Sequence, residues 1–250
     1  MSDLDRTAVT LTGVSKRFGA NAPVVLDGVD LRVGDGEFVC LLGASGCGKS
    51  TILNLIAGLE QPTTGEIAVP SGAVAMMFQD AALLPWLTAR RNVELALDLG
   101  GAPRDQRRAR VDELLELVSL SHAADRRPHE LSGGMRQRVA LARALAQDRH
   151  VLLMDEPFAA VDAITRDLLH VELERIWRQT GRTIVFVTHN VREALRLGQR
   201  IVLLSSRPGR VAAEWTVPAD VRAGADPVET ARLDDQITRR LREELIRNAA

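Results

Sequence analysis

The chain has few cysteines and aromatic residues, almost no net charge and no long hydrophobic run. Its two cysteines, Cys40 and Cys47, cannot form a disulfide framework or a four-cysteine zinc site. The formal net charge of −1 gives no electrostatic reason to bind nucleic acid, and we expect no such partner. The longest nearly unbroken apolar stretches, 38–44 and 81–87, are seven residues each. A transmembrane helix needs ~20 residues, so a membrane-spanning chain is excluded.

The rest of the composition is that of a globular protein. The 250 residues are 46% hydrophobic and 26% charged, which suits one domain with an elaboration. Residues 1–6 are polar, and no apolar core of a signal peptide follows them. Together with the low cysteine content, this predicts a reducing, cytoplasmic setting. Only two of the 32 basic residues are lysine, Lys16 and Lys49, and the other thirty are arginine.

Apolar patterns predict an α/β fold. Residues 38–42 form a continuous apolar run, as expected of a strand buried on both faces. The turn signal Gly34-Asp35-Gly36 predicts that this strand and the preceding one, 26–33, are antiparallel neighbours. Further strands at 151–154, 183–187 and 201–204 alternate with helices, which predicts a mostly parallel sheet covered by helices.

The same patterns divide the chain into regions. We expect a core over about 7–85 and 136–206, with an antiparallel β subdomain at its N-terminal end, and a helical insert over about 86–135. A helical tail is predicted over about 207–250, in which Asp226 is the N-cap of a terminal helix. Its apolar stripe either docks on its own domain or forms a dimer or partner surface; the stripe contains Leu233, Ile237, Leu241 and Leu245.

Residues 43–50, GASGCGKS, match the phosphate-binding pattern G-x-x-x-x-G-K-[ST] between a predicted strand and a predicted helix. The glycines allow backbone N–H groups to surround a phosphate, and the helix N-terminus adds partial positive charge. Lys49 is expected to reach the β- and γ-phosphates and Ser50 to ligate Mg²⁺. The Cys47 thiol is either sensitive to oxidation or simply a small side chain that fits the loop. The predicted nucleotide-binding residues here are Gly43, Ala44, Ser45, Gly46, Cys47, Gly48, Lys49, Ser50 and Thr51.

Two carboxylates follow the predicted strand 151–154. Ligands of open parallel sheets bind at the carboxyl ends of the strands, where Asp155 and Glu156 stand. Asp155 is expected to hold Mg²⁺, and Glu156 to polarise the water that attacks the γ-phosphate. The alternative, two solvated charges at a strand end, does not explain why a phosphate loop accompanies them.

Residues 131–138 read LSGGMRQR. Ser132 is expected to cap a helix, and Gly133 and Gly134 in its first turn would expose backbone N–H groups to an anion. A plain capped helix does not account for two glycines, which lower helix propensity. The segment therefore indicates a second phosphate-binding helix end.

With this segment, the chain over about 9–210 resembles the ATPase subunit of an ATP-binding cassette (ABC) transporter, and LSGGMRQR resembles that family's signature. The resemblance implies a P-loop NTPase core in which two copies pair head to tail, each ATP lying between one phosphate loop and the partner's Ser132, Gly133 and Gly134. It also implies roles for four other residues: Gln79 senses Mg²⁺ and the γ-phosphate, Asp162 lies in the D-loop 159–162 that crosses the dimer, His189 orients the γ-phosphate and water, and Phe18 stacks on adenine.

The chain departs from the family pattern at three positions. Ala159 lacks the serine hydroxyl that usually begins the D-loop, Asn190 replaces a frequent aspartate, and Phe18 replaces the commoner tyrosine. None of these removes a catalytic group, so Lys49, Glu156 and His189 are expected to support hydrolysis. The apolar run 81–87 after Gln79 is either internal core or, as the resemblance implies, part of the surface that receives the membrane subunit.

The predicted function is an ATP-hydrolysing subunit, peripheral at the cytoplasmic face of the membrane, that powers a separate membrane permease and indirectly serves a solute-binding protein. The strings at 83–93, 128–145 and 203–211 are most similar to the nitrate, sulfonate and taurine importer group. An alternative is a non-transport ABC ATPase of DNA repair or translation. Such proteins usually have two cassettes, a long coiled-coil insert or a basic surface, and none of these is seen in this sequence.

Overall fold

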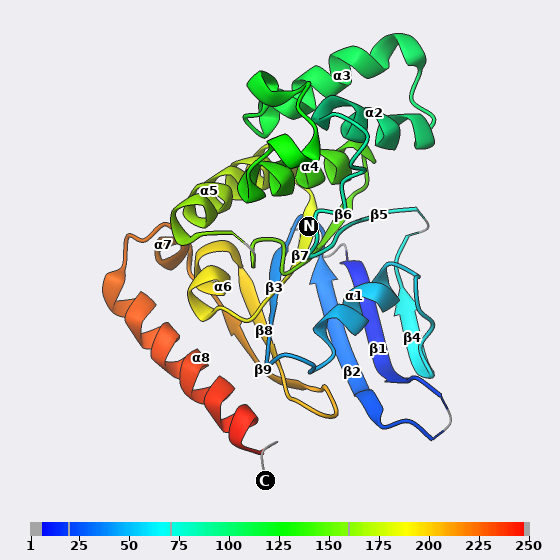
Figure 1. Cartoon of the computed structure of the whole chain (residues 1–250). Coiled ribbons are helices and arrows are strands. Elements are labelled where there is room, and N and C mark those ends of the chain that lie inside the picture. The colour runs from blue at the N-terminus through cyan, green and yellow to red at the C-terminus, as the bar shows by residue number, and fades with distance from the viewer. Residues whose placement is uncertain (1–6, 20, 71, 160, 248–250) are drawn as a thin grey trace.

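A computed structural model describes residues 7–19, 21–70, 72–159 and 161–247 (Figure 1). The strands are β1 (Thr7–Arg17), β2 (Val24–Gly34), β3 (Phe38–Leu42), β4 (Thr64–Ala68), β5 (Val74–Met77), β6 (Val151–Asp155), β7 (Thr183–Thr188), β8 (Arg200–Leu204) and β9 (Val211–Thr216). The helices are α1 (Lys49–Ile56), α2 (Ala89–Leu99), α3 (Arg104–Leu117), α4 (Gly133–Ala146), α5 (Ala163–Thr180), α6 (Val191–Leu197), α7 (Ala219–Arg222) and α8 (Pro227–Arg247), with 3-10 turns η2 (Ser121–Ala123) and η3 (Pro128–Glu130).

A six-stranded sheet in the order β5-β6-β7-β3-β8-β9 forms the centre of the fold. Its first five strands are parallel, as the sequence predicts. All five residues of β3 are buried because alternate side chains enter different cores. Phe38 and Cys40 pack with the helices on one face, whereas Val39 and Leu41 pack with α1 and the small sheet on the other. The continuous apolar run thus marks a central strand.

The predicted antiparallel pairing of the second and third strands is wrong. The second strand, β2, pairs with β1 in a separate sheet of order β2-β1-β4, and β3 lies between β7 and β8. Residues 34–36 do form a turn, in which the Glu37 carboxylate accepts a hydrogen bond from Gly34 N at 2.8 Å. The two strands separate because β3 is apolar on both faces and needs two buried neighbours, whereas β2 alternates buried and exposed positions.

The sequence analysis also missed β9, which lies in the predicted helical tail. This strand pairs antiparallel with β8 at the edge of the sheet, so the tail begins as part of the core. Its side chains are half-buried or exposed, because an edge strand has one neighbour. Such a strand lacks the strong apolar run that identifies β3 and β8.

Helices α2 and α3 of the 86–135 region lie on the side of α4 that faces away from the three-stranded sheet (Figure 1). Helix α3 begins after Pro103 and buries Val111, Leu114 and Leu115 on one side. It packs on α2 and α4. The two glycines of the signature segment stand in the first turn of α4, as the sequence predicts.

The C-terminal helix α8 runs beside α6 (Figure 1). Asp226 caps it as predicted: its Oδ1 accepts a hydrogen bond from Glu229 N at 2.9 Å. Within the apolar stripe, Leu233 and Ile237 are buried in the core, whereas Leu245 is exposed. Most of the stripe therefore docks on its own domain. Across the described ranges, no helix combines the length and hydrophobicity needed to cross a membrane.

Candidate nucleotide site

The phosphate loop connects β3 to α1 at the carboxyl edge of the parallel sheet. Gly46 and Gly48 have φ values of 77° and 99°, a left-handed conformation that glycine adopts without strain. The Lys49 ammonium is 5% exposed and donates hydrogen bonds to the carbonyl oxygens of Gly43 and Ala44 at 2.8 and 2.9 Å. The loop thus surrounds a buried positive charge at a helix N-terminus, an arrangement that suits a phosphate group.

Gly48 should be the least replaceable residue of this loop. A Cβ built on it would lie 2.5 Å from Leu26 Cδ2, and its φ of 99° already disfavours any side chain. We expect Gly48→Ala to lower the free energy of unfolding by about 2 kcal/mol or more and to abolish ATP binding, because the loop or the buried Leu26 side chain must move to relieve the clash. Urea denaturation with and without ATP measures both effects.

Gly58→Ala is the matched control. Gly58 also has a positive φ, of 71°, but a Cβ there would have no heavy atom within 4 Å. This variant should lose only about 1 kcal/mol for the backbone strain and should keep ATP binding. Equal effects of the two substitutions would show that the contact with Leu26 is unimportant.

Two acidic residues at the end of β6 face the loop. Burial raises the pKa of the Asp155 carboxyl above its ordinary value, and a hydrogen bond with the Ser50 side chain acts in the opposite direction. Glu156 Oε1 lies 3.8 Å from Lys49 Nζ, and Glu156 Oε2 lies 2.9 Å from His189 Nδ1. The fold therefore brings together the three side chains predicted to be catalytic, from segments that follow β3, β6 and β7.

The oxygen donors near the loop suit Mg²⁺. This ion prefers oxygen ligands and is commonly held by one or two carboxylates together with substrate phosphates. The Ser50 hydroxyl and the Asp155 carboxylate are hydrogen-bonded to each other and together offer two oxygen ligands for this ion. No group of three or more His, Cys, Asp or Glu residues able to hold a metal occurs in the described part of the chain. Gln79, the third predicted ligand, is exposed on the loop after β5.

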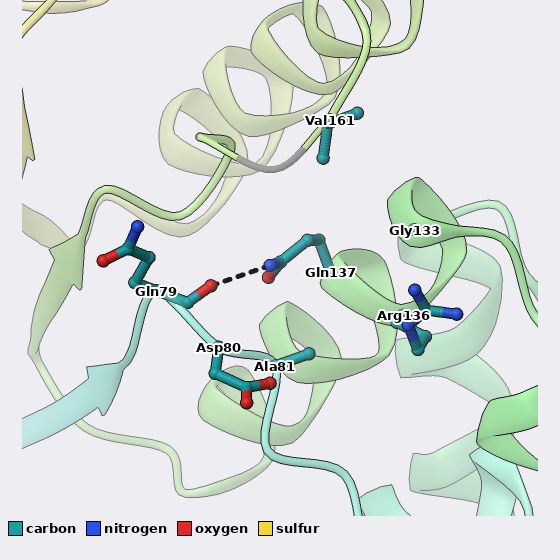
Figure 2. Close-up of a pocket in the computed structure, with 7 residues that line it drawn as sticks. All are labelled: Gln79, Asp80, Ala81, Gly133, Arg136, Gln137 and Val161. Carbon is teal, nitrogen blue, oxygen red and sulfur yellow. Dashed lines mark hydrogen bonds between the residues drawn. The ribbon is translucent and has the colours of Figure 1, made fainter.

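A separate cavity of about 370 Å³ lies between the Gln79 loop and the start of α4 (Figure 2). Gln137 of α4 donates a hydrogen bond through Nε2 to the backbone oxygen of Gln79 at 3.0 Å. This bond holds the Gln79 loop against α4, the helix that begins in the LSGGMRQR segment and is called the signature helix below. Gly133 and Val161 line the same cavity, from the first turn of α4 and from the segment before α5. Ser132 caps α4 as predicted by accepting a hydrogen bond from Met135 N at 3.3 Å.

The family model described as ABC transporter matches residues 26–159. The chain belongs to the ABC transporter family. It is 48% identical over 239 residues to aliphatic sulfonates import ATP-binding protein SsuB 1 of Burkholderia cenocepacia (strain HI2424), covering 94% of this chain and 72% of that protein. It is 43% identical over 246 residues to taurine import ATP-binding protein TauB of Burkholderia pseudomallei (strain 1710b), covering 95% and 94%.

Among solved structures, this ABC cassette resembles the dimeric ATP-binding cassette MJ0796 in a post-hydrolysis state bound to ADP and Pi. The TM-score is 0.74 at 35% identity, over 84% of this chain and 99% of that chain. The predicted ABC ATPase fold is thereby confirmed, and the chain is an ATP-binding ABC transporter ATPase. The roles of individual site residues stay predictions.

The cassette does not bring all of the predicted site residues together. In the described ranges, no hydrogen bond or ion pair joins Ser132, Gly133 or Gly134 to the phosphate loop. Asp162 caps α5 by accepting a hydrogen bond from Thr165 N at 3.0 Å, which is the main reason that its pKa is lowered. Ala160 of the predicted D-loop lies outside the described residues. The predicted site residues Ser132, Gly133, Gly134 and Asp162 thus form a second group, at the starts of α4 and α5.

Phe18, predicted to stack on adenine, directly follows β1 and is 50% exposed. Lys16 Nζ lies 4.7 Å from the centroid of its ring. A cation at this distance is attracted to the ring face, so the pair restrains the aromatic side chain while leaving half of it accessible. That exposure is compatible with the predicted stacking.

The structure decides between the two readings of Cys47. This thiol is buried, and desolvation raises its pKa, although the nearby Lys49 ammonium acts in the opposite direction. A protonated, inaccessible thiol reacts slowly with oxidants, because the thiolate is the reactive form. Cys47 is therefore a small packing residue of the loop.

Two polar contacts near the site were not found by sequence reasoning. Arg143 of α4 donates to the carbonyl oxygens of Ala81 and Ala82 at 2.7 and 2.8 Å. Together with Gln137, it holds the chain just after Gln79 against the signature helix. Gln137 stands inside the LSGGMRQR string, but neither side chain follows a local pattern that predicts its partner, about sixty residues away in sequence.

A buried polar network lies directly behind His189, at the end of β7. Glu193 of α6 accepts a hydrogen bond from the Thr188 hydroxyl, and its Oε1 lies 2.6 Å from His170 Nε2 on α5. Thr188 immediately precedes His189, and its Oγ accepts a hydrogen bond from Asn190 N at 3.0 Å. The end of β7 is thereby fixed to two helices. His170 has no sequence pattern that would predict this contact, because its partner Glu193 lies 23 residues away in the chain.

The apolar run 81–87 is divided between core and surface. Ala81 is buried and Leu83 packs against the helical core, whereas Trp86 is 67% exposed. Part of the run is therefore internal core, and reception of a membrane subunit by its exposed part stays a prediction. An exposed tryptophan beside the Gln79 loop is a feature of partner-binding surfaces.

Proposed function

We propose that the chain hydrolyses ATP as the energy-supplying subunit of an importer for a small anionic or zwitterionic solute such as a sulfonate or taurine. The proposed catalysis rests on the position of Glu156 between Lys49 and His189. One carboxylate oxygen of Glu156 faces the Lys49 ammonium and the other faces the His189 ring. The names of the relatives, an aliphatic sulfonates import protein and a taurine import protein, support the solute class. No residue of this chain is proposed to contact the solute.

In the proposed reaction, a water oxygen attacks the γ-phosphorus while the bond to the β–γ bridging oxygen breaks. Glu156 accepts the proton that the water loses, and the hydrogen bond to His189 Nδ1 orients the carboxylate. Lys49 neutralises charge on the transferred phosphoryl group. Ser50, Asp155 and Gln79 would hold Mg²⁺, which when bound neutralises charge on the β- and γ-phosphate oxygens.

We propose that two copies pair head to tail, with the Ser132–Gly134 segment of each completing the site of the other. The separation of this segment from its own phosphate loop and the dimeric state of the MJ0796 cassette support this pairing. The further partners are integral membrane permease subunits and, indirectly, a solute-binding protein. The chain would then be peripheral at the cytoplasmic face of the membrane.

Trp86 offers a test of the permease interaction. Trp86→Ser should reduce recovery of the permease from detergent-solubilised membranes roughly tenfold or more, because exposed tryptophans often dominate interfaces. ATPase activity of the isolated chain should stay unchanged. Val228→Ser, which removes an 81% exposed apolar side chain of α8, is the control and should leave permease recovery unaffected. Recovery of nucleic acid or ribosomes without an integral membrane protein would instead support the non-transport alternative.

A further inference from the structure

A cavity of about 410 Å³ lies between α6, α7 and α8, apart from the nucleotide site. Figure 1 shows these helices gathered at the side of the six-stranded sheet, and α6 contacts both α7 and α8. Apolar side chains form much of the wall: Leu195 of α6, Val221 of α7, and Pro227 and Ala231 of α8. The cavity thus offers a hydrophobic surface for a small molecule.

Three arginines line the same cavity and only one carboxylate accompanies them. Arg192 and Arg196 are one turn apart on α6, Arg222 ends α7, and the acid is Asp234 of α8. Asp234 Oδ2 lies 3.9 Å from Arg192 Nε, so this pair accounts for one of the three positive charges. Arg196 and Arg222 have no carboxylate partner in the cavity wall, although Glu174, outside it, attracts Arg222, whose guanidinium also lies 5.8 Å from the centroid of the Trp177 ring.

Those two guanidiniums also have buried donors without acceptors. Within the described part of the chain, Nε of Arg196 and Nε of Arg222 are shielded from solvent and have no hydrogen-bond partner. Arg138 on α4 also has such an Nε, whereas Arg200 bonds to Glu37 and Glu214, and Arg182 bonds to Asp148. Leaving a buried charged donor unsatisfied is costly, so the position of Arg196 and Arg222 beside an open cavity needs an explanation.

We propose that this cavity binds a small amphiphilic anion, an organic sulfonate or carboxylate with a short apolar tail. The planar guanidinium forks of Arg196 and Arg222 match the oxygens of either acid group. The tail would lie on Leu195, Val221 and Ala231. A ligand held there would contact α6, whose first residue, Val191, follows His189 by two positions.

Isothermal titration calorimetry with the full chain tests the proposal, with 1-hexanesulfonate and hexanoate as probes. We expect one probe molecule per chain, and at least tenfold weaker binding in Arg196→Gln and in Arg222→Gln. Arg239→Gln is the control, because Arg239 is exposed on α8 outside the cavity, and it should bind like the wild type. Hexan-1-ol lacks the anion and sulfate lacks the tail, so neither should bind at the same concentration.

Equal binding of sulfate would overturn the proposal, since it would indicate an adventitious ion only, and so would unaltered binding in both cavity variants. A preference between the two probes distinguishes a sulfonate ligand from a carboxylate ligand. Hydrogen exchange of the wild-type chain gives a readout that needs no variant. Saturating 1-hexanesulfonate should slow amide exchange in α6 and α8 and leave α3 unchanged, whereas protection confined to other elements would place the probe elsewhere and contradict the proposal.

Discussion

Replacing Glu156 with glutamine should abolish ATP hydrolysis while leaving ATP binding nearly unchanged. Glutamine keeps the size of the side chain but cannot accept a proton from water, whereas the carboxylate lies 3.8 Å from Lys49 Nζ and 2.9 Å from His189 Nδ1. Removing a general base typically lowers the rate by roughly 100-fold or more. We expect a fall of this size in the steady-state rate, and accumulation of an ATP-bound dimer in size-exclusion chromatography.

Glu174→Gln is a suitable control for this experiment. Glu174 pairs with Arg178 one turn along α5, and a partly exposed ion pair of this kind should contribute little to stability or activity. This variant should hydrolyse ATP at the wild-type rate and should not accumulate a dimer. Turnover of Glu156→Gln at the wild-type rate would contradict the assignment of Glu156 as the base.

The parts of the site that follow strands of the central sheet were predictable from the sequence. Lys49, Glu156 and His189 come from distant segments, but each closely follows a strand whose apolar run marks it as buried. Parallel strands place such residues at one edge. The sequence therefore places the three side chains at one edge of the sheet, whereas their convergence depends on the strand order β6-β7-β3, which only the structure shows.

The backbone of Glu156 was not predictable. Its φ is +41°, an uncommon conformation for a residue with a side chain, and its N–H donates to Val187 O at 3.1 Å. Strain of this kind is tolerated where surrounding contacts fix the chain, and it occurs often at functional sites. It places the carboxylate beside Lys49 and His189 at the point where β6 ends. No sequence pattern distinguishes this glutamate from one in an ordinary turn.

Strand pairing and long-range polar contacts also could not be predicted from the sequence. A turn signal between β2 and β3 shows that the chain reverses, but not that the two strands enter different sheets. Likewise, the bond of Gln137 to the Gln79 backbone and those of Arg143 to residues 81 and 82 depend on how α4 packs. Local patterns describe elements, whereas these contacts depend on packing between elements.

Gly134→Val should eliminate ATP hydrolysis while leaving the phosphate loop of the same chain unaltered. A Cβ at Gly134 would clash with Thr165 Cγ2, so the first turn of α4 would move. We expect roughly a 100-fold or greater loss of activity if this turn completes the partner's site. Lys49→Ala should cause a similar loss through the other half of the site. Each variant alone then forms dimers in which both composite sites are damaged.

Mixing the two inactive variants should restore activity. In a head-to-tail mixed dimer, the phosphate loop of the Gly134→Val chain meets the signature segment of the Lys49→Ala chain, and that site is intact. Random pairing makes half of the dimers mixed, each with one good site, so about a quarter of the wild-type rate is expected if the sites act independently. If hydrolysis instead used the phosphate loop and signature of a single chain, the mixture would be as inactive as its components. The recovered rate, measured as phosphate release against the mixing ratio, therefore tests whether Ser132, Gly133 and Gly134 act on the partner's ATP.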